Sequence, residues 1–167
     1  MAEASFAEPG RDQIRARQRA RRLALASIFE ADFGQRPAQA VLERHLAESE
    51  SDPEAIRFAR LLVALAVEHR DQIDERIGQL APQYPVVQLA RIDRALLRAA
   101  LGEVLHSAAT PARVAISEWV ELARMYSGDP ARRLMNGVLG RLSRDAAGLT
   151  EELVVGSAND DAGVPAG

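Results

Sequence analysis

Three short motifs, each an Asp or Thr followed by proline, mark points where helices begin. They are Asp52-Pro53, Thr110-Pro111 and Asp129-Pro130. Proline suits the first turn of a helix because its missing N–H would have no intrahelical partner there, and the preceding side chain can accept a hydrogen bond from a free backbone N–H. Apolar residues follow each motif at intervals of three and four, the period of an amphipathic helix. These motifs are hard to reconcile with strands, and no segment shows sustained alternation of apolar and polar residues.

The apolar spacing predicts an all-α bundle of six or seven helices in one domain, residues 14–145. The expected helices cover residues 14–33, 38–46, 52 to about 78–82, 85–106, 110–126 and 129–145, with Gly34 ending the first in a left-handed conformation. A chain of 167 residues that is 47% hydrophobic can build one core. Residues 1–13 are expected to form a flexible arm. Residues 146–167 are expected to form an acidic, mostly disordered tail, in which only the segment LTEELVV could be ordered.

The residues needed for several kinds of catalytic or metal site are missing. The chain has no cysteine, no phosphate-binding loop, no dinucleotide fingerprint and no HExxH or GxSxG motif. Its three histidines are far apart in the sequence; His69 lies on an apolar stripe and is expected to be partly buried and hydrogen-bonded. The neighbouring acids Asp71, Asp74 and Glu75 are expected on a solvated helix face. We therefore predict a protein that is not an enzyme and holds no metal or cofactor.

No apolar run approaches the roughly 18 residues of a membrane span, and the N-terminus lacks the apolar core of a secretory signal. The sequence thus predicts a cytoplasmic protein with no membrane contact.

The basic residues are unevenly placed. All 21 are arginine, and with 24 acidic residues the formal net charge is −3. Residues 11–22 hold six arginines and one acid, and residues 132–144 hold four arginines and no acid. By contrast, residues 30–75 hold eleven acids and five arginines, and residues 145–167 hold five acids and no arginine. Codon choice in a GC-rich genome would account for the lack of lysine but not for this distribution.

The first helix is expected to carry a row of arginines. At about 100° per residue, the following residues fall within about 80° of one another: Arg11, Arg15, Arg19 and Arg22. Arg17 and Arg21 lie instead on the arc that apolar residues bury farther along the helix. Guanidinium groups pair with phosphate oxygens and stack on bases, so the row suits single-stranded nucleic acid or RNA. A solvated helix end is the alternative, as is a protein-binding helical scaffold whose arginine face meets an acidic partner.

Four dispersed segments resemble the NusB family of transcription antitermination factors, over roughly residues 17–144. They are RARQRARRLALASIFEADF at the start, IDRALLRAALGEVL at 92–105, PARVAISEWVELARMYSGD at 111–129 and RRLMNGVLGRLSR at 132–144. Each segment alone would be weak evidence, but four in the right order are specific.

The resemblance implies a fold of two packed helical halves and a function in transcription. Members of this family bind the boxA segment of ribosomal and other leader RNA together with NusE, a small-subunit ribosomal protein. The complex joins RNA polymerase in an antitermination complex. Carried over by position, the RNA-contacting residues would be Arg17, Arg19, Arg21, Arg22, Arg132, Arg133 and Asn136. Phe29 and Asp93 match the surface that faces NusE.

The sequence allows more than one role for several of these residues. Asp93 could form an internal ion pair with an arginine such as Arg98, or anchor a basic group of a partner. Phe29 could be a core aromatic, and Asn136 could simply allow close helix packing. Three residues depart from the family pattern and put the second RNA segment in doubt: Ser127, Pro130 and Leu134. The chain could be a monomer or a homodimer, and its acidic tail could fold back on the arginines.

Overall fold

The computed structural model describes residues 9–159, with side chains described for residues 9–146. Helices form seven α elements and one short 3₁₀ turn within that range, and the range contains no strand. The elements are α1 (Arg11–Ala31), α2 (Ala38–Glu48), α3 (Pro53–Glu68), α4 (Arg70–Leu80), η1 (Val86–Gln88), α5 (Arg91–His106), α6 (Ala112–Tyr126) and α7 (Asp129–Asn159). The predicted all-α fold is confirmed. None of the helices described is both long enough and apolar enough to cross a membrane.

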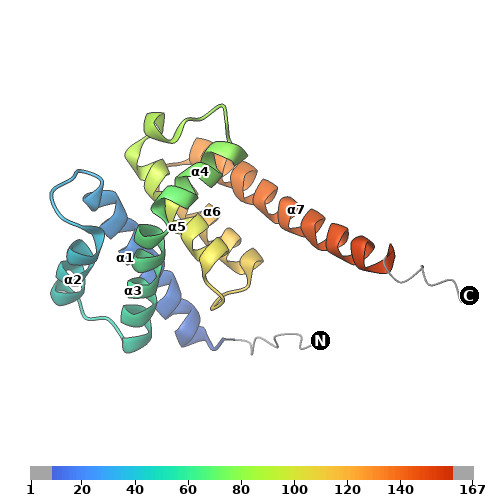
Figure 1. Cartoon of the computed structure of the whole chain (residues 1–167). Coiled ribbons are helices and arrows are strands. Elements are labelled where there is room, and N and C mark those ends of the chain that lie inside the picture. The colour runs from blue at the N-terminus through green and yellow to red at the C-terminus, as the bar shows by residue number, and fades with distance from the viewer. Residues whose placement is uncertain (1–8, 160–167) are drawn as a thin grey trace, which may run out of the picture.

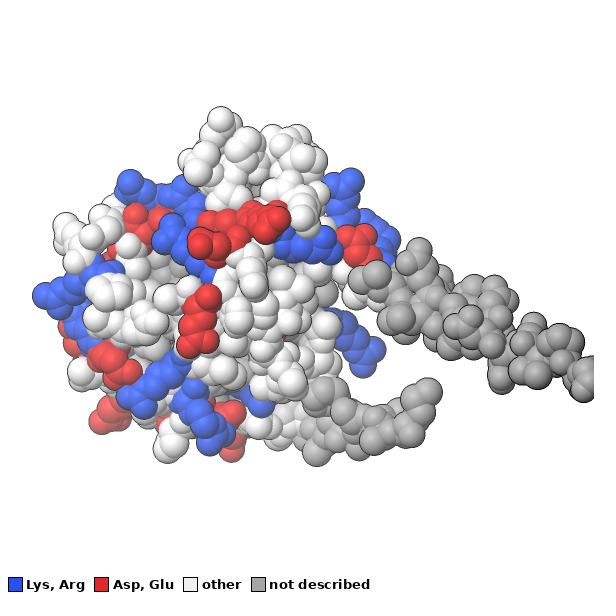
Figure 2. All heavy atoms as spheres, in the orientation of Figure 1, with Lys and Arg blue, Asp and Glu red and all other residues white. Residues whose placement is uncertain are grey.

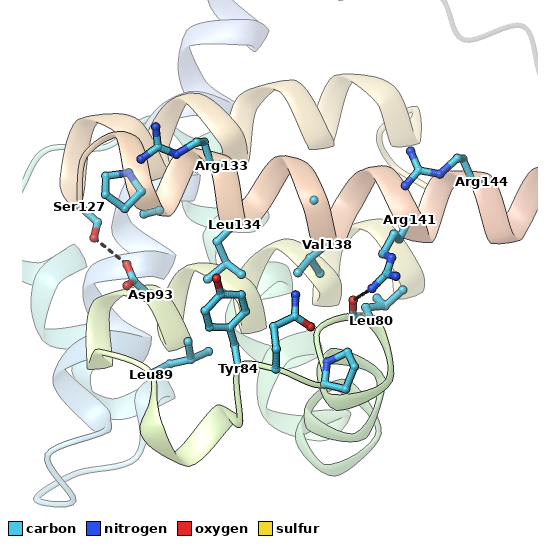
Figure 3. Close-up of a pocket in the computed structure, with 15 residues that line it drawn as sticks. Leu80, Tyr84, Leu89, Asp93, Ser127, Arg133, Leu134, Val138, Arg141 and Arg144 are labelled. Atoms are coloured by element: carbon cyan, nitrogen blue, oxygen red, sulfur yellow. Dashed lines mark hydrogen bonds between the residues drawn. The ribbon is translucent and has the colours of Figure 1, made fainter.

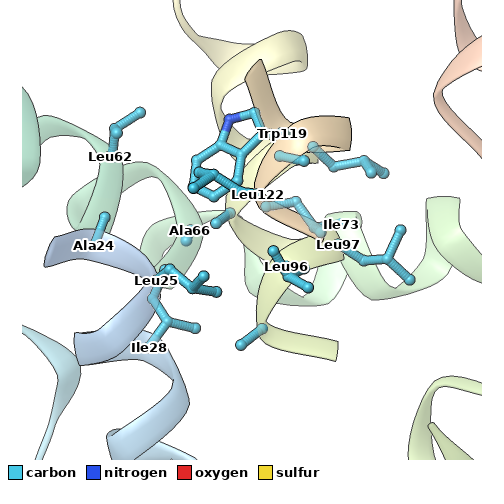
Figure 4. Close-up of a cluster of buried hydrophobic side chains, with 14 of the residues drawn as sticks. Ala24, Leu25, Ile28, Leu62, Ala66, Ile73, Leu96, Leu97, Trp119 and Leu122 are labelled. Atoms are coloured by element: carbon cyan, nitrogen blue, oxygen red, sulfur yellow. The ribbon is translucent and has the colours of Figure 1, made fainter. Parts of the chain in front are cut away.

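The helices form two packed groups around α5 (Figure 1). Helices α1, α2 and α3 pack on one another, α6 packs on α7, and α5 contacts members of both groups. The core between them contains Leu25, Leu62, Leu96, Leu97 and Trp119, each at most 1% exposed (Figure 4). Gly102 allows α3 and α5 to pack closely. A Cβ atom at position 102 would lie 3.3 Å from the backbone nitrogen of Ala66.

Two predicted helix boundaries are confirmed by their local geometry. The Asp52 side chain accepts a hydrogen bond from the Ala55 N–H at 2.9 Å, with Pro53 as the first residue of α3. Gly34 follows α1 with a φ of 81°, the left-handed conformation that glycine adopts without steric cost.

Other predicted boundaries are wrong. The single helix expected from residue 52 ends at Leu80, within the expected range of 78–82, but it is broken at His69, whose φ of −105° and ψ of 17° separate α3 from α4. Pro85 introduces only the 3₁₀ turn η1, and α5 begins at Arg91, because Leu89 and Ala90 are extended. Thr110 does not cap α6; its hydroxyl oxygen is buried and has no hydrogen-bond partner within residues 9–146.

The two ends of the chain also differ from expectation. Helix α1 begins at Arg11, so residues 11–13 of the predicted arm are helical, and residues 1–8 lie outside the described residues. Helix α7 continues through the start of the predicted tail to Asn159. The physical reason is composition: alanine, leucine and glutamate dominate residues 146–153 and favour helix, and Gly148 alone does not end it. The rest of the predicted tail, residues 160–167, lies outside the described residues.

Candidate nucleic-acid interface

The outer face of α1 carries the arginine row expected from the wheel. Arg15 and Arg22 are exposed, and Arg19 is partly buried. Arg19 donates to the Ser51 Oγ at 3.1 Å and to the Glu50 carbonyl oxygen at 2.8 Å. Among the described residues, no carboxylate lies within ion-pair distance of any of these three arginines. Their positive charge is therefore available to an external anion.

Arg21 does not belong to this surface, which corrects the assignment carried over from the resemblance. Its side chain is 3% exposed and forms a two-pronged ion pair with the fully buried Glu103, with Nε–Oε2 at 3.0 Å and Nη2–Oε1 at 2.7 Å. Glu103 also accepts a hydrogen bond from Trp119 Nε1 at 2.6 Å. These bonds tie α1, α5 and α6 together. Arg21 is thus a core residue and cannot reach RNA in this fold.

Arg17 is partly withdrawn from the surface. Its Nη1 donates to the Ala109 carbonyl oxygen at 2.9 Å, its Nε lies 3.5 Å from a Glu54 oxygen, and its guanidinium lies 5.0 Å from the Phe58 ring centre. Burial, followed by the positive charge of Arg21, lowers the pKa of Arg17. The side chain holds the loop before α6 against α1, so any contact with RNA would compete with these bonds.

The second predicted RNA segment is split between two sides of α7. Asn136 is exposed and lines a groove between α6 and α7 that also includes Gln18 of α1 and Arg113 of α6. Gln18 donates to Glu118 at 3.3 Å and so links α1 to this groove. Arg133 instead lines a different groove, which contains Asp93 (Figure 3).

Arg132 is partly buried at the start of α7. Its Nε lies 3.4 Å from an Asp129 oxygen, one helical turn away. The groove that Asn136 shares with Gln18 brings Asn136 close to the arginine face of α1, whereas Arg133 lines the other groove.

Two residues near the arginine face were not predicted as site residues. Arg113 is exposed, forms no ion pair within the described part of the chain and lines the Asn136 groove. Tyr126 is 49% exposed and lines a hollow with Arg19, Arg22 and residues of α2. An exposed aromatic ring beside unpaired arginines can stack on a base. The sequence shows that Tyr126 ends an amphipathic helix, but not that this end lies next to α1.

The body of the molecule is not uniformly basic. In the view of Figure 2, arginines and acidic residues are interspersed over the surface. On this face of the molecule, a polyanion would therefore not meet a continuous positive surface.

The aromatic end of α1 forms a separate surface. Phe29 is partly buried and packs edge to face on Phe33, with ring centres 5.4 Å apart. Phe33 is 52% exposed, and the Arg91 guanidinium lies 4.2 Å from its ring centre. Arg94 joins this end of α1 to the 3₁₀ turn, because it bonds both Asp32 and the backbone carbonyl of Val86. Phe29 is therefore neither a simple core residue nor fully exposed.

Asp93 accepts a hydrogen bond from the Ser127 hydroxyl at 2.6 Å. The suggested ion pair between Asp93 and Arg98 is wrong, because Arg98 pairs with Asp74 at 2.8 Å and with Asp32 at 3.6 Å. The expectation that Asp74 is merely solvated is wrong for the same reason. Asp93 stands in the first turn of α5, where the helix dipole favours a negative charge. Its carboxylate remains accessible to a partner, because it lies on the wall of the groove that holds Arg133.

Two of the three histidines lie side by side. His69 stacks on His106, with ring centres 3.7 Å apart and planes 6° from parallel. His69 is partly buried as predicted. Its ring stacks on His106, and within residues 9–146 it does not form the expected side-chain hydrogen bond. Within residues 9–146, no three His, Asp or Glu side chains are grouped to hold a metal ion.

Comparison with known proteins matches the NusB family model to residues 18–144, most of the helical bundle. The chain belongs to the NusB family. It is 40% identical, over 139 residues, to the transcription antitermination protein NusB of Dehalococcoides mccartyi strain CBDB1, covering 81% of this chain and 97% of that protein. It is 43% identical over 126 residues to NusB of Roseiflexus castenholzii, covering 74% and 89%.

Solved NusB structures share the fold. NusB of T. maritima superposes with a TM-score of 0.71 at 28% identity, covering 77% of this chain and 90% of that one. A NusB chain from a crystal structure of the antitermination factors NusB and NusE with double-stranded RNA superposes with a TM-score of 0.72 at 22% identity, covering 79% and 98%. The NusB family consists of transcription antitermination factors, in agreement with the prediction of a non-enzymatic protein.

Proposed function

We propose that this NusB-family chain binds boxA-like single-stranded RNA together with NusE and supports processive transcription of ribosomal RNA operons. In this role it joins the antitermination complex on RNA polymerase in the cytoplasm. One observation carries the RNA part of the proposal: Arg15, Arg19 and Arg22 share an exposed helix face and have no carboxylate partner among the described residues. A NusB relative with the same fold was crystallised with NusE and double-stranded RNA, which supports RNA and NusE as the two kinds of ligand.

The RNA track we propose runs along α1 and continues to Asn136. Arg19 and Arg22 neutralise phosphates, and Tyr126 beside them offers a ring for one base. Gln18 and Arg113 lie between this row and Asn136 and extend the polar surface. Arg132 stands one helical turn before Asn136 and adds a further cation.

Arg17 and Arg133 have smaller roles in this proposal. Arg17 is held by Ala109 and Glu54, and Arg133 faces away from α1 into the groove that contains Asp93. Arg21 has no role in RNA binding.

The NusE-facing surface we propose lies around the first turn of α5. On one side, the Phe29–Phe33 pair and Arg91 offer an apolar patch bordered by a cation. On the other side, Asp93 offers a carboxylate for a basic group of the partner. A protein that contacts both sides would be positioned by charge at one point and by apolar burial at the other.

Fluorescence anisotropy with a labelled boxA-like RNA, with and without NusE, tests the proposal. The double variant Arg19→Glu/Arg22→Glu should abolish measurable affinity. The control Arg36→Glu/Arg70→Glu changes the net charge equally at two exposed arginines elsewhere and should bind as the unaltered chain does. Affinity should fall with salt at a slope of about −0.7 for each phosphate neutralised on a single strand.

The NusE arm uses Asp93→Asn, which should remove the gain in affinity on adding NusE while leaving binding to RNA alone unchanged. Equal affinity for boxA and a scrambled RNA, together with no gain from NusE, would refute the proposal. That result would favour a purely protein-binding scaffold.

A further inference from the structure

Two neutral oxygen atoms of the turn between α2 and α3 hold the side chain of Arg19. Its Nε donates to the Ser51 Oγ at 3.1 Å, and its Nη2 donates to the Glu50 carbonyl oxygen at 2.8 Å. Glu50 and Asp52 lie in the same turn, yet no carboxylate of residues 9–146 lies within ion-pair distance of this guanidinium. The turn therefore fixes the position of Arg19 without neutralising its charge.

The other arginines on this part of α1 lack one of these two properties. Arg17 and Arg21 are held in place, but each has a carboxylate partner. Arg15 and Arg22 have no carboxylate partner, but within residues 9–146 no hydrogen bond fixes their exposed side chains. Arg19 is thus both fixed and free of a carboxylate.

The bonds to the turn occupy one edge of the Arg19 guanidinium and leave the other open. A guanidinium presents its N–H donors in a planar fork. The turn takes the Nε–H and one N–H of Nη2, so both N–H groups of Nη1 and the second N–H of Nη2 remain. These are the donors that a phosphate can accept in a two-pronged arrangement. Arg19 lines the hollows on both sides of the arginine row, so its open edge is accessible to a strand that lies there.

We propose that the Ser51 hydroxyl and the Glu50 backbone carbonyl are positioning groups of the RNA site, which hold Arg19 as a preformed fork for one phosphate. This inference rests on the proposed RNA-binding function. Arg19 stands one helical turn from both Arg15 and Arg22, so repulsion between like charges acts on its side chain. The two bonds to the turn counteract this repulsion. They also order the side chain during folding, so that binding does not have to restrict it.

The Ser51 hydroxyl is tested by fluorescence anisotropy with a labelled boxA-like RNA at several salt concentrations. Ser51→Ala leaves every charge in place, so it should weaken binding about three- to tenfold without changing the salt slope. Ser51→Thr keeps a hydroxyl and should restore most of the affinity. The control is Asp52→Ala at the next residue, which removes a hydrogen bond to Ala55 and should bind RNA as the unaltered chain does.

A pair of lysine variants separates position from charge. Lysine keeps the positive charge but lacks the planar fork. Arg19→Lys should weaken binding by about the same factor as Ser51→Ala, and Ser51→Ala should then have no further effect, because both changes remove the same interaction. Arg22→Lys is the matched control: its side chain is not held, so binding should weaken by no more than about twofold.

The inference is overturned if Ser51→Ala binds RNA as tightly as the unaltered chain while Arg19→Glu/Arg22→Glu still abolishes binding. That result would leave the proposed function intact. It is also overturned if Ser51→Ala lowers the midpoint of urea denaturation and its affinity falls only in proportion to the unfolded fraction, because the two bonds would then merely join the turn to α1. If the unaltered chain does not bind the RNA at all, the proposed function fails, and this inference fails with it.

Discussion

The buried Arg21–Glu103 pair gives the sharpest test of the separation between core and surface arginines. Replacing Arg21 with Met keeps the length of the side chain but removes the cation. Glu103 then loses two charge-assisted hydrogen bonds and keeps only the Trp119 N–H. At about 1.5–3 kcal/mol for each such bond, the expected loss in the free energy of unfolding is about 3–6 kcal/mol. The range of about 3–5 kcal/mol for a broken buried ion pair agrees.

Urea denaturation followed by fluorescence measures this loss directly. Trp119 is the only tryptophan and is fully buried beside the pair, so its emission reports unfolding. Arg22→Met is the matched control: the same substitution at the next residue, which is exposed, should change the free energy of unfolding by no more than about 0.5 kcal/mol. Adding Glu103→Gln to Arg21→Met removes the unpaired charge, so the double variant should be more stable than additivity predicts, by about 1–3 kcal/mol.

The effects of these two substitutions on RNA binding should be in the opposite order to their effects on stability. Measured well below the unfolding transition, Arg22→Met should weaken binding and Arg21→Met should leave it unchanged. The reasoning is refuted if Arg21→Met costs less than about 1 kcal/mol, if the two substitutions at the pair are additive, or if Arg21→Met weakens RNA binding in a fully folded protein.

Three further predictions concern stability. Asp52→Ala removes a helix N-cap and should lower the free energy of unfolding by about 1 kcal/mol in urea denaturation, with no effect on RNA affinity. Gly102→Val adds bulk against the backbone of Ala66 and should cost about 1–3 kcal/mol; a smaller loss would mean that α3 and α5 can separate freely. Burial, and then the neighbouring His69, lower the pKa of His106 in the folded state. The unfolded chain therefore takes up this proton first, so stability should be full above about pH 6.5 and fall as the pH drops through the lower pKa of the folded protein. His106→Gln should flatten this part of the pH profile of the melting temperature, and an unchanged profile would contradict the assignment.

Local chemistry made much of the helical layout predictable. The Asp52 cap and the Gly34 turn depend on residues next to one another, and their motifs identified them correctly. The break at His69 was not predictable in this way, because no proline or glycine marks it. The chain changes direction there so that α4 can pack on α5 and α7, and the His69–His106 stack joins residues that the sequence cannot place together.

For the site, the helical wheel was a better guide than the resemblance. The wheel placed Arg17 and Arg21 on the arc that apolar residues bury, and the structure holds both of them in internal bonds. The resemblance treated Arg17, Arg19, Arg21 and Arg22 alike. Neither could show that Arg133 and Asn136, three residues apart, face different grooves, because that depends on where α6 and the α4–α5 segment pack against α7.

The outer face of α1 also determines the distance between an RNA strand and a protein that bind to it. Arg15, Arg22 and Phe29 follow one another at intervals of seven residues, so they lie almost in line along the helix. Two turns, or about 10 Å, separate Arg22 from Phe29, which is no more than the width of one helix with its side chains. An RNA strand on the arginines and a protein on the aromatic pair would therefore touch each other. Contact between the RNA and the protein would raise the affinity of this chain for each of them by the same factor. This coupling would need no change in the shape of α1.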